Sequence, residues 1–166
     1  MRQYRASRNL EASLIDYLVE ELDNDGWEGI QCVKSLKRDK QGVILLKPPI
    51  ILINVISNPR QKLEIGSGKF LTFPIVYIRI FATNDGQRLD LADWVLEKLE
   101  GDITYYSYMI DDGQVHTKHE SGAISIINIA RDEKELVNTN PESLEEEDRY
   151  RHLIEFSCYV GLTPDC

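Results

Sequence analysis

Apolar residues recur at helical spacing in two stretches of the chain. One stripe of leucines runs over residues 8–23, where Ser7 or Asn9 is expected to supply the capping oxygen at the start. A second stripe runs over residues 86–100, directly after three candidate caps at residues 83–85. The spacing therefore predicts two amphipathic helices. The apolar face of the second helix is expected to carry Leu89, Ala92, Leu96 and Leu99.

β-Branched and aromatic runs between and after these helices predict strands. The longest run, residues 69–82, has apolar side chains on both faces, which is typical of a central strand or of a strand covered on two sides. Pro74 near its start predicts a bulge or an edge section, because proline cannot donate to a sheet ladder. Further extended segments are expected at residues 27–37, 43–46, 50–56, 103–110, 123–130 and 150–160.

The order of these elements is helix, strands, helix and strands, with no repeated strand–helix–strand unit. This order predicts an α+β fold in which a mostly antiparallel or mixed, curved sheet packs against two helices. The length of 166 residues fits one domain, residues 1–166. No apolar run reaches about 18 residues, so no membrane partner is expected. The N-terminus lacks the apolar core of a signal peptide, so the chain is expected to stay in the compartment where it is made.

Negative charge is concentrated in one stretch of the chain. The formal net charge is −9, and residues 132–148 hold eight acids and one lysine, a net charge of −7, so the remainder carries −2. We therefore expect a nearly neutral folded body with an acidic, flexible loop over residues 132–149. A basic nucleic-acid footprint is not seen in the composition, and Arg2, Arg5 and Arg8 form only a small basic arm.

The cysteines and histidines do not form a recognisable ligand pattern. Three widely spaced cysteines argue against a disulfide framework, and Cys32 and Cys158 are expected to be buried apolar residues of strands. His116 and His119 are three residues apart in a stretch that reads as turn-rich, and no paired cysteines accompany them. Solvated histidines are the simpler interpretation. No metal site and no cofactor are expected.

A phosphate-binding loop is the first catalytic pattern to test. Residues 66–69 read Gly-Ser-Gly-Lys, but position 70 is Phe70 where a magnesium-binding hydroxyl is needed, and Leu63 occupies the position of the first glycine. The stretch also precedes a predicted strand rather than a helix. We therefore interpret residues 66–69 as the tip of a loop.

A metal-dependent nuclease is the second pattern. Asp90, Asp93, Glu97 and Lys98 are the nearest candidate cluster, and all four lie on the second predicted helix. Such charges usually form a solvated helix face. No Gly-x-Ser-x-Gly elbow occurs either. The sequence therefore predicts no catalytic residue and no enzyme activity. A nuclease that uses Asp90, Asp93 or Glu97 remains a minor hypothesis.

One extended pattern resembles a known family. It consists of Pro59-Arg60-x-x-x-Glu64-Ile65-Gly66, then the strand 73–82, then a helix that begins at 86–89 with Gly-Gln-Arg-Leu. This order is similar to that of the tail terminator and head–tail joining proteins of tailed bacteriophages. The resemblance covers residues 7–131, and the acidic loop departs from the family pattern.

The resemblance implies a structural virion protein of the tail or neck, made in the host cytoplasm. Such proteins form hexameric rings that cap the tail tube and dock on the head–tail connector or stopper protein. Double-stranded DNA passes through the ring without sequence-specific binding. In this family the segment that matches Arg60, Glu64, Ile65 and Gly66 lies around subunit contacts, so a pair between Arg60 and Glu64 of neighbouring subunits is one expectation. Two solvated loop charges are the alternative.

A rival hypothesis is a non-viral protein-binding module without catalysis. Strands with apolar residues on both faces need cover, and two helices supply only part of it. A partner protein could supply the rest through a two-fold dimer. The oligomeric state distinguishes the hypotheses, because the family resemblance predicts a ring and the rival predicts a dimer.

Overall fold

The computed structural model describes residues 2–3, 6–42, 44–57, 60–62, 70–72, 74–111, 114–134 and 152–164. Within these ranges the chain forms two helices and nine strands. In chain order they are β1 (Arg2–Gln3), α1 (Ala6–Asn24), β2 (Gln31–Val33), β3 (Ile50–Ser57), β4 (Arg60–Lys62), β5 (Phe70–Thr72), β6 (Ile75–Ala82), α2 (Asp85–Leu99), β7 (Ile103–Asp111), β8 (Gln114–Lys134) and β9 (His152–Pro164).

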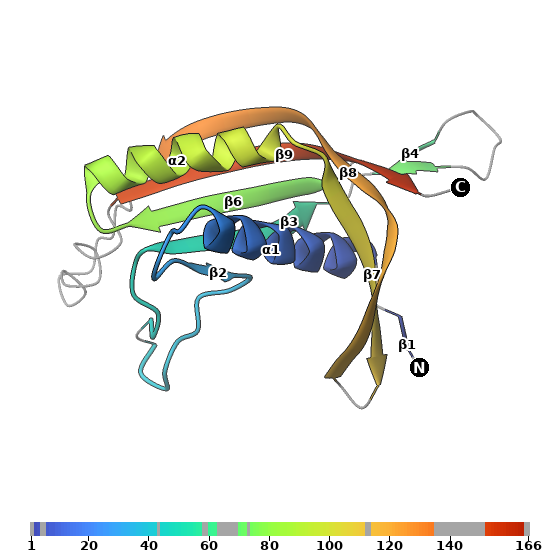
Figure 1. The fold of residues 1–166 in the computed structure, drawn as a ribbon, viewed down its shortest axis with the longest axis horizontal. Helices are drawn as coiled ribbons and strands as arrows, with labels where there is room; N and C mark the ends of the chain where they lie inside the picture. Colours follow the sequence, from blue (N-terminus) through green and yellow to red (C-terminus); the bar gives the residue numbers. More distant parts are fainter. Residues whose placement is uncertain are drawn as a thin grey trace.

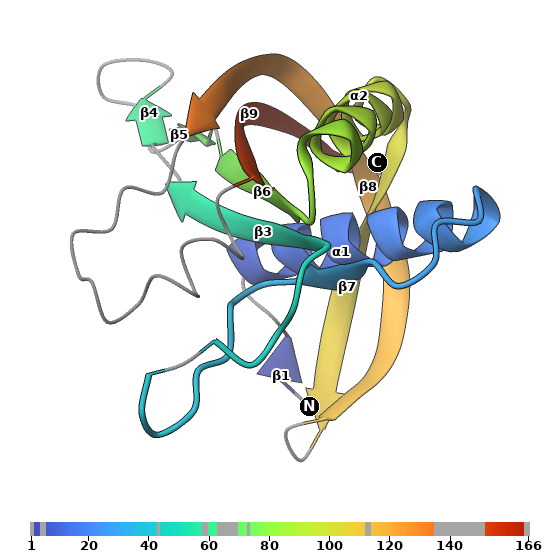
Figure 2. The same cartoon turned by 90° about the vertical axis from the view of Figure 1, so that its left-hand side faces the viewer.

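Seven strands form one mixed, curved sheet in the order β1-β7-β8-β9-β6-β3-β2. Only β2 and β3 pair in parallel, and every other neighbouring pair is antiparallel. The sheet curls around α1, and both helices lie on its inner face (Figures 1 and 2). The predicted α+β class, a curved mixed sheet packed against two helices, is confirmed.

The main core lies between the helices and the inner face of the sheet. Four leucines of α1 face it at helical spacing, and α2 covers the neighbouring strands. The residues of β6 and β9 that face the main core are fully buried. These residues are Val76, Ile78, Ile80, Ile154, Phe156, Cys158 and Val160.

A second, smaller apolar cluster covers part of the outer face of the sheet. Residues 34–49, which we call the covering loop, place the buried Ile44 against the sheet, with Leu36 and Leu46 packed beside it. The cluster beneath contains Ile50, Leu52, Phe81 and Leu153. β6 is therefore central and covered on both faces at this end, as its sequence predicts.

Helix α2 begins as predicted but is rotated relative to the predicted face. Its cap is Asn84, whose Oδ1 accepts a hydrogen bond from the Gln87 backbone N–H at 2.9 Å. Leu89, expected on the buried face, is 42% exposed. The correct stripe includes Leu91 and Val95, which lie four residues apart on the same side. The buried residues are Leu91, Ala92, Trp94, Val95 and Leu99.

Asn9 does not cap α1, because the helix already begins at Ala6. The Asn9 side chain instead accepts a hydrogen bond from the Tyr108 backbone N–H at 3.3 Å, and Ser13 Oγ accepts one from the Tyr106 backbone N–H at 2.9 Å. β1 pairs with β7 only at Ile110 and Met109, so it does not reach the backbone N–H groups of Tyr106 and Tyr108. Two polar residues of α1 thereby satisfy part of an exposed sheet edge.

Several predicted strand boundaries were wrong. Of residues 27–37 only β2 is a strand, and within 43–46 the described residues include only an isolated bridge from Ile44 to Arg38. The run 69–82 is divided into β5 and β6 at Pro74, as the proline indicates. The segment 123–130 is part of β8, which is much longer. His116 and His119 therefore lie in a strand rather than a turn, and residues 132–134 of the predicted acidic loop belong to the sheet.

The C-terminal ends of the two helices are tied together by a polar cluster. Lys98 Nζ lies 2.6 Å from Glu21 Oε2 and 2.8 Å from Asp25 Oδ2, and Trp94 Nε1 donates to the same Asp25 oxygen at 2.8 Å. Hydrogen bonds from Lys98 and, to a smaller extent, from Trp94 lower the pKa of Asp25. Tyr17 adds a hydrogen bond to the Lys98 carbonyl at 2.9 Å.

The two described cysteines should react slowly in the folded protein. Burial raises the pKa of Cys32 and of Cys158 to about 12 from an ordinary 9.0. In a Cys166→Ser chain at about pH 8, we expect Ellman's reagent to modify both thiols much more slowly in buffer than in denaturant. Because both pKa values are raised by folding, stability is retained below pH 9.0 and falls as the pH rises from there toward 12.

The labelling rate is measured by absorbance. The fall in stability with pH is measured by circular dichroism during reversible alkaline unfolding. Equal labelling rates in buffer and in denaturant would contradict the burial of both side chains. Cys158 is fully buried in the main core, whereas Cys32 is only half-buried, so Cys32 should react first.

Candidate assembly surface

Exposed apolar side chains gather on the uncovered part of the outer sheet face. Tyr159 of β9 is 44% exposed and pairs with Ile75 of β6 and with Asn128 of β8. Ile75 and Tyr77 are half-buried on the same face, and Ile127 of β8 is 62% exposed. We call Ile75, Tyr77, Ile127 and Tyr159 the outer patch.

A β-bulge places Ile127 in this patch. The register between β8 and β9 shifts between Ile126 and Asn128, which leaves Ile127 without a paired residue. Its side chain lies over Gly161, where an added Cβ would come within 3.3 Å of Ile127 Cδ1. A bulge and a facing glycine thus hold a large apolar side chain on the surface, where it contributes nothing to the two cores.

A two-stranded arm begins beside the outer patch. β4 and β5 pair with each other in a separate ladder that continues the β3–β6 hairpin beyond the main sheet (Figure 1). The Pro74 carbonyl at its base accepts a hydrogen bond from the Val160 backbone N–H at 3.0 Å. The arm is therefore anchored next to Tyr159 and Ile75. An isolated two-stranded ribbon is only marginally stable in water.

The residues expected at a subunit interface map to this arm. Arg60 is the first residue of β4, so it lies in the ribbon rather than in a loop. Glu64, Ile65 and Gly66 lie outside the described residues, as do residues 67–69 of the rejected phosphate-loop pattern. The expected Arg60–Glu64 pair between subunits remains a prediction.

The structure does not bring the nuclease candidates together. Asp93 is 77% exposed and lies 3.6 Å from Arg131 of β8, whereas Lys98 faces the opposite way toward α1. Asp90 and Glu97 are exposed on α2. Among the residues that the structure describes, no three His, Cys, Asp or Glu side chains gather closely enough to hold a metal ion.

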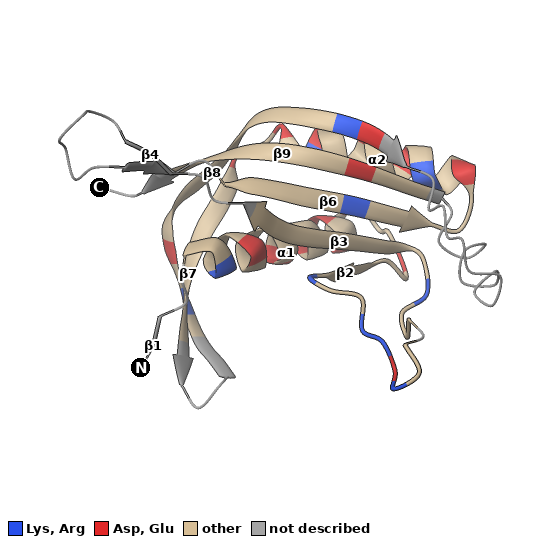
Figure 3. Cartoon of the chain, turned by 180° about the vertical axis from the view of Figure 1, so that it is seen from behind, with Lys and Arg blue, Asp and Glu red and all other residues tan. Residues whose placement is uncertain are grey.

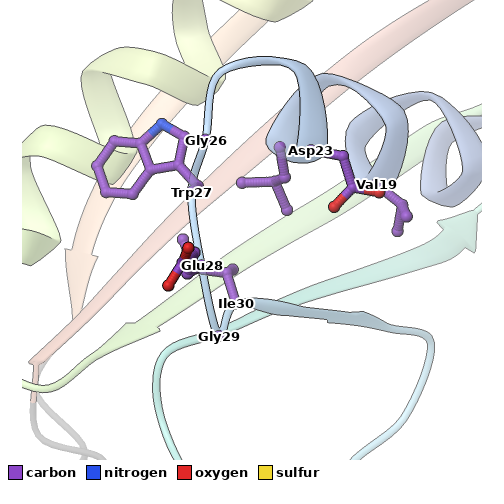
Figure 4. Close-up of a pocket in the computed structure, with 8 residues that line it drawn as sticks. Val19, Asp23, Gly26, Trp27, Glu28, Gly29 and Ile30 are labelled. Carbon is purple, nitrogen blue, oxygen red and sulfur yellow. The ribbon is translucent and has the colours of Figure 1, made fainter.

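A half-open hollow of about 400 Å³ lies at the end of α1 (Figure 4). Val19, Leu22, Trp27 and Ile30 form its apolar walls, and Asp23 and Glu28 line it with acidic groups. Gly26 and Gly29 form the turn with positive φ values of 74° and 76°. The residues that line the hollow include no converging set of catalytic groups.

No model of a known protein family matches the chain, and neither does any curated protein. Neither described helix combines the length and the hydropathy needed to cross a membrane.

Sequence reasoning missed the outer patch as a site, although one signal was available. The alternation of residues 150–160 already places Tyr159 opposite the core-facing residues. Ile127 could not be located in advance, because a bulge inside a β-branched run leaves no mark in the sequence.

Proposed function

We propose that the chain is a structural subunit of a tailed-phage virion. In this proposal it caps the tail tube as a homo-hexameric ring and joins the tube to the head connector or stopper protein. Double-stranded DNA passes through the ring without sequence-specific binding, and the chain performs no catalysis. The proposal rests on the family resemblance of residues 7–131 together with the surface described above.

The pairing of a projecting arm with an exposed apolar patch supports the proposal most strongly. The β4–β5 arm extends from the sheet, and the outer patch offers uncovered apolar area at its base. A contact between an arm and a patch joins two different surfaces, so it can repeat from one copy to the next until a ring closes. Aromatic side chains such as Tyr159 are the type that carries most binding energy at interfaces.

The charge distribution is compatible with a ring that conducts DNA. Outside residues 132–148 the net charge is only −2, so the body would neither hold phosphates tightly nor repel them strongly. A strongly basic body would bind the DNA backbone and slow its passage.

Light scattering of the purified full chain, alone and mixed with tail tubes, tests the oligomeric state. We expect a species of six copies of the 19.1 kDa chain, formed in solution or on addition of the tubes. A closed two-fold dimer under both conditions would favour the protein-binding module. A strict monomer that never joins tail tubes would contradict the ring.

A further inference from the structure

The covering loop carries a concentration of positive charge that is unusual for this acidic chain. Residues 34–49 contain five basic residues and one acid, a net charge of +4 in a chain whose total is −9. All five basic side chains are exposed, and Figure 3 marks basic positions along the backbone of this loop. They are Lys34, Lys37, Arg38, Lys40 and Lys47.

The loop has a fixed shape that turns its charges outward. The Leu45 backbone N–H donates to the Lys37 carbonyl at 2.9 Å, and the Gly42 N–H donates to the Asp39 carbonyl at 3.1 Å. Gly42 takes the left-handed conformation, with φ of 87°. Ile44 is buried against the sheet on the opposite side. Apolar residues anchor the loop, and its cations are displayed to solvent on an ordered turn.

The most acidic part of the chain leaves and re-enters the sheet beside this loop. β8 ends at Lys134, which pairs with Leu153 of β9, and Leu153 belongs to the apolar cluster that Ile44 completes. The intervening residues 135–148, which we call the acidic segment, contain six acids and no basic residue. The whole connection between β8 and β9, residues 135–151, is long enough to reach roughly 25 Å from the sheet and return, at about 3.3 Å per residue.

We propose that the covering loop is the docking surface for the acidic segment of the same chain. The loop carries a net charge of +4 and the acidic segment one of −6, and the short tether between them gives an effective concentration on the order of millimolar. A second copy at micromolar concentration would compete poorly with that tether. The contact would also occupy the cations that could otherwise attract DNA phosphates.

Zero-length carbodiimide cross-linking, read by mass spectrometry, tests this contact on a mixture of unlabelled and ¹⁵N-labelled full chain. At about 10 mM salt, where charges act over about 30 Å, we expect cross-links from loop lysines to the carboxylates of residues 142–148. Each cross-linked peptide pair should carry one isotope only. The cross-links should be lost at about 1 M salt, where the screening length is about 3 Å.

A charge-reversal variant separates docking from chance proximity. Lys37→Glu/Lys40→Glu should abolish the remaining cross-links of Lys34 and Lys47, because the segment no longer docks. Lys118→Glu is the matched control, since Lys118 is an exposed lysine of β8 and its reversal should leave those cross-links intact. Unchanged Lys34 and Lys47 cross-links in the double variant would overturn the proposal.

Two other outcomes would also overturn it. Cross-links of mixed isotope content would assign the loop to a second copy of the chain. Failure to cross-link at low salt, combined with retention of duplex DNA by the wild-type chain and its loss in Lys37→Glu/Lys40→Glu, would assign the loop to nucleic acid.

Discussion

Replacing Arg79 with methionine should lower the free energy of unfolding by about 3 kcal/mol. Arg79 of β6 and Glu155 of β9 face each other across the centre of the sheet and form an ion pair through Arg79 Nε. Glu155 is only 2% exposed, so the substitution removes the ion pair between Arg79 and a buried carboxylate. The expected loss is at the lower end for a buried pair, because Arg79 keeps a third of its side chain in solvent. Urea unfolding followed by circular dichroism measures it.

Two variants show whether the pair itself is responsible. Arg79→Met/Glu155→Met should recover most of the loss, because no buried charge remains. Lys118→Met removes an exposed pair with Asp16 at 3.4 Å and should cost no more than about 1 kcal/mol. If Arg79→Met were as mild as Lys118→Met, the pair would not be the buried, coupled interaction that the geometry indicates.

Ile127→Glu/Tyr159→Glu should abolish assembly and leave the fold intact. Ile127 is 62% exposed and Tyr159 44% exposed, so the substitutions cost little in the isolated chain. In an interface they would place two charges where an apolar contact is needed, and loss of one central contact costs about 2 kcal/mol or more. The association constant between neighbouring copies, measured from the concentration dependence of light scattering, should therefore fall by roughly 30-fold or more, and the thermal midpoint should change little.

Leu89→Glu is the matched control for that variant. Leu89 is 42% exposed, almost the same as Tyr159, but it lies on α2 rather than on the outer sheet face. The control should assemble like the wild type. If both variants assembled equally well, the outer patch would not be the interface. If both failed, the effect would be one of added negative charge.

The parts of the fold that repeat a simple period could be predicted from the sequence. In α1 the leucines recur at helical spacing, and in β6 and β9 apolar residues recur at every second position. Each of these elements turns one side toward the core, so its core-facing residues can be predicted from the spacing. The strand–turn–helix unit around Asn84 was also visible, because the cap chemistry is local.

The parts that depend on long-range contacts could not be predicted. The roles of Asn9 and Ser13 depend on β7, which lies more than ninety residues away in the sequence. β8 extends well past its apolar run because its ends pair with β7 and β9, so polar residues such as His119 belong to the strand. Extended segments were predicted over residues 27–37 and 43–46, whereas the covering loop packs on the outer face of the sheet, and this packing depends on Leu153 at the far end of the chain.

The candidate site divides in the same way. The segment around Arg60 was found through a sequence pattern, and the structure places Arg60 in a ribbon that projects from the sheet. The outer patch combines three strands, and one of its members is exposed only because of a bulge, so no local pattern could reveal it. The positive charge of the covering loop was hidden by the net charge of −9.

Electron microscopy of tail tubes with and without the full chain shows directly whether the chain forms a ring. We expect a single sixfold ring of this chain at the end of the tube, with the β4–β5 arm of each copy on the outer patch of its neighbour. Ile127→Glu/Tyr159→Glu should leave the tube ends bare. Tube ends that remain bare with the wild-type chain, or a closed dimer bound elsewhere, would contradict this expectation.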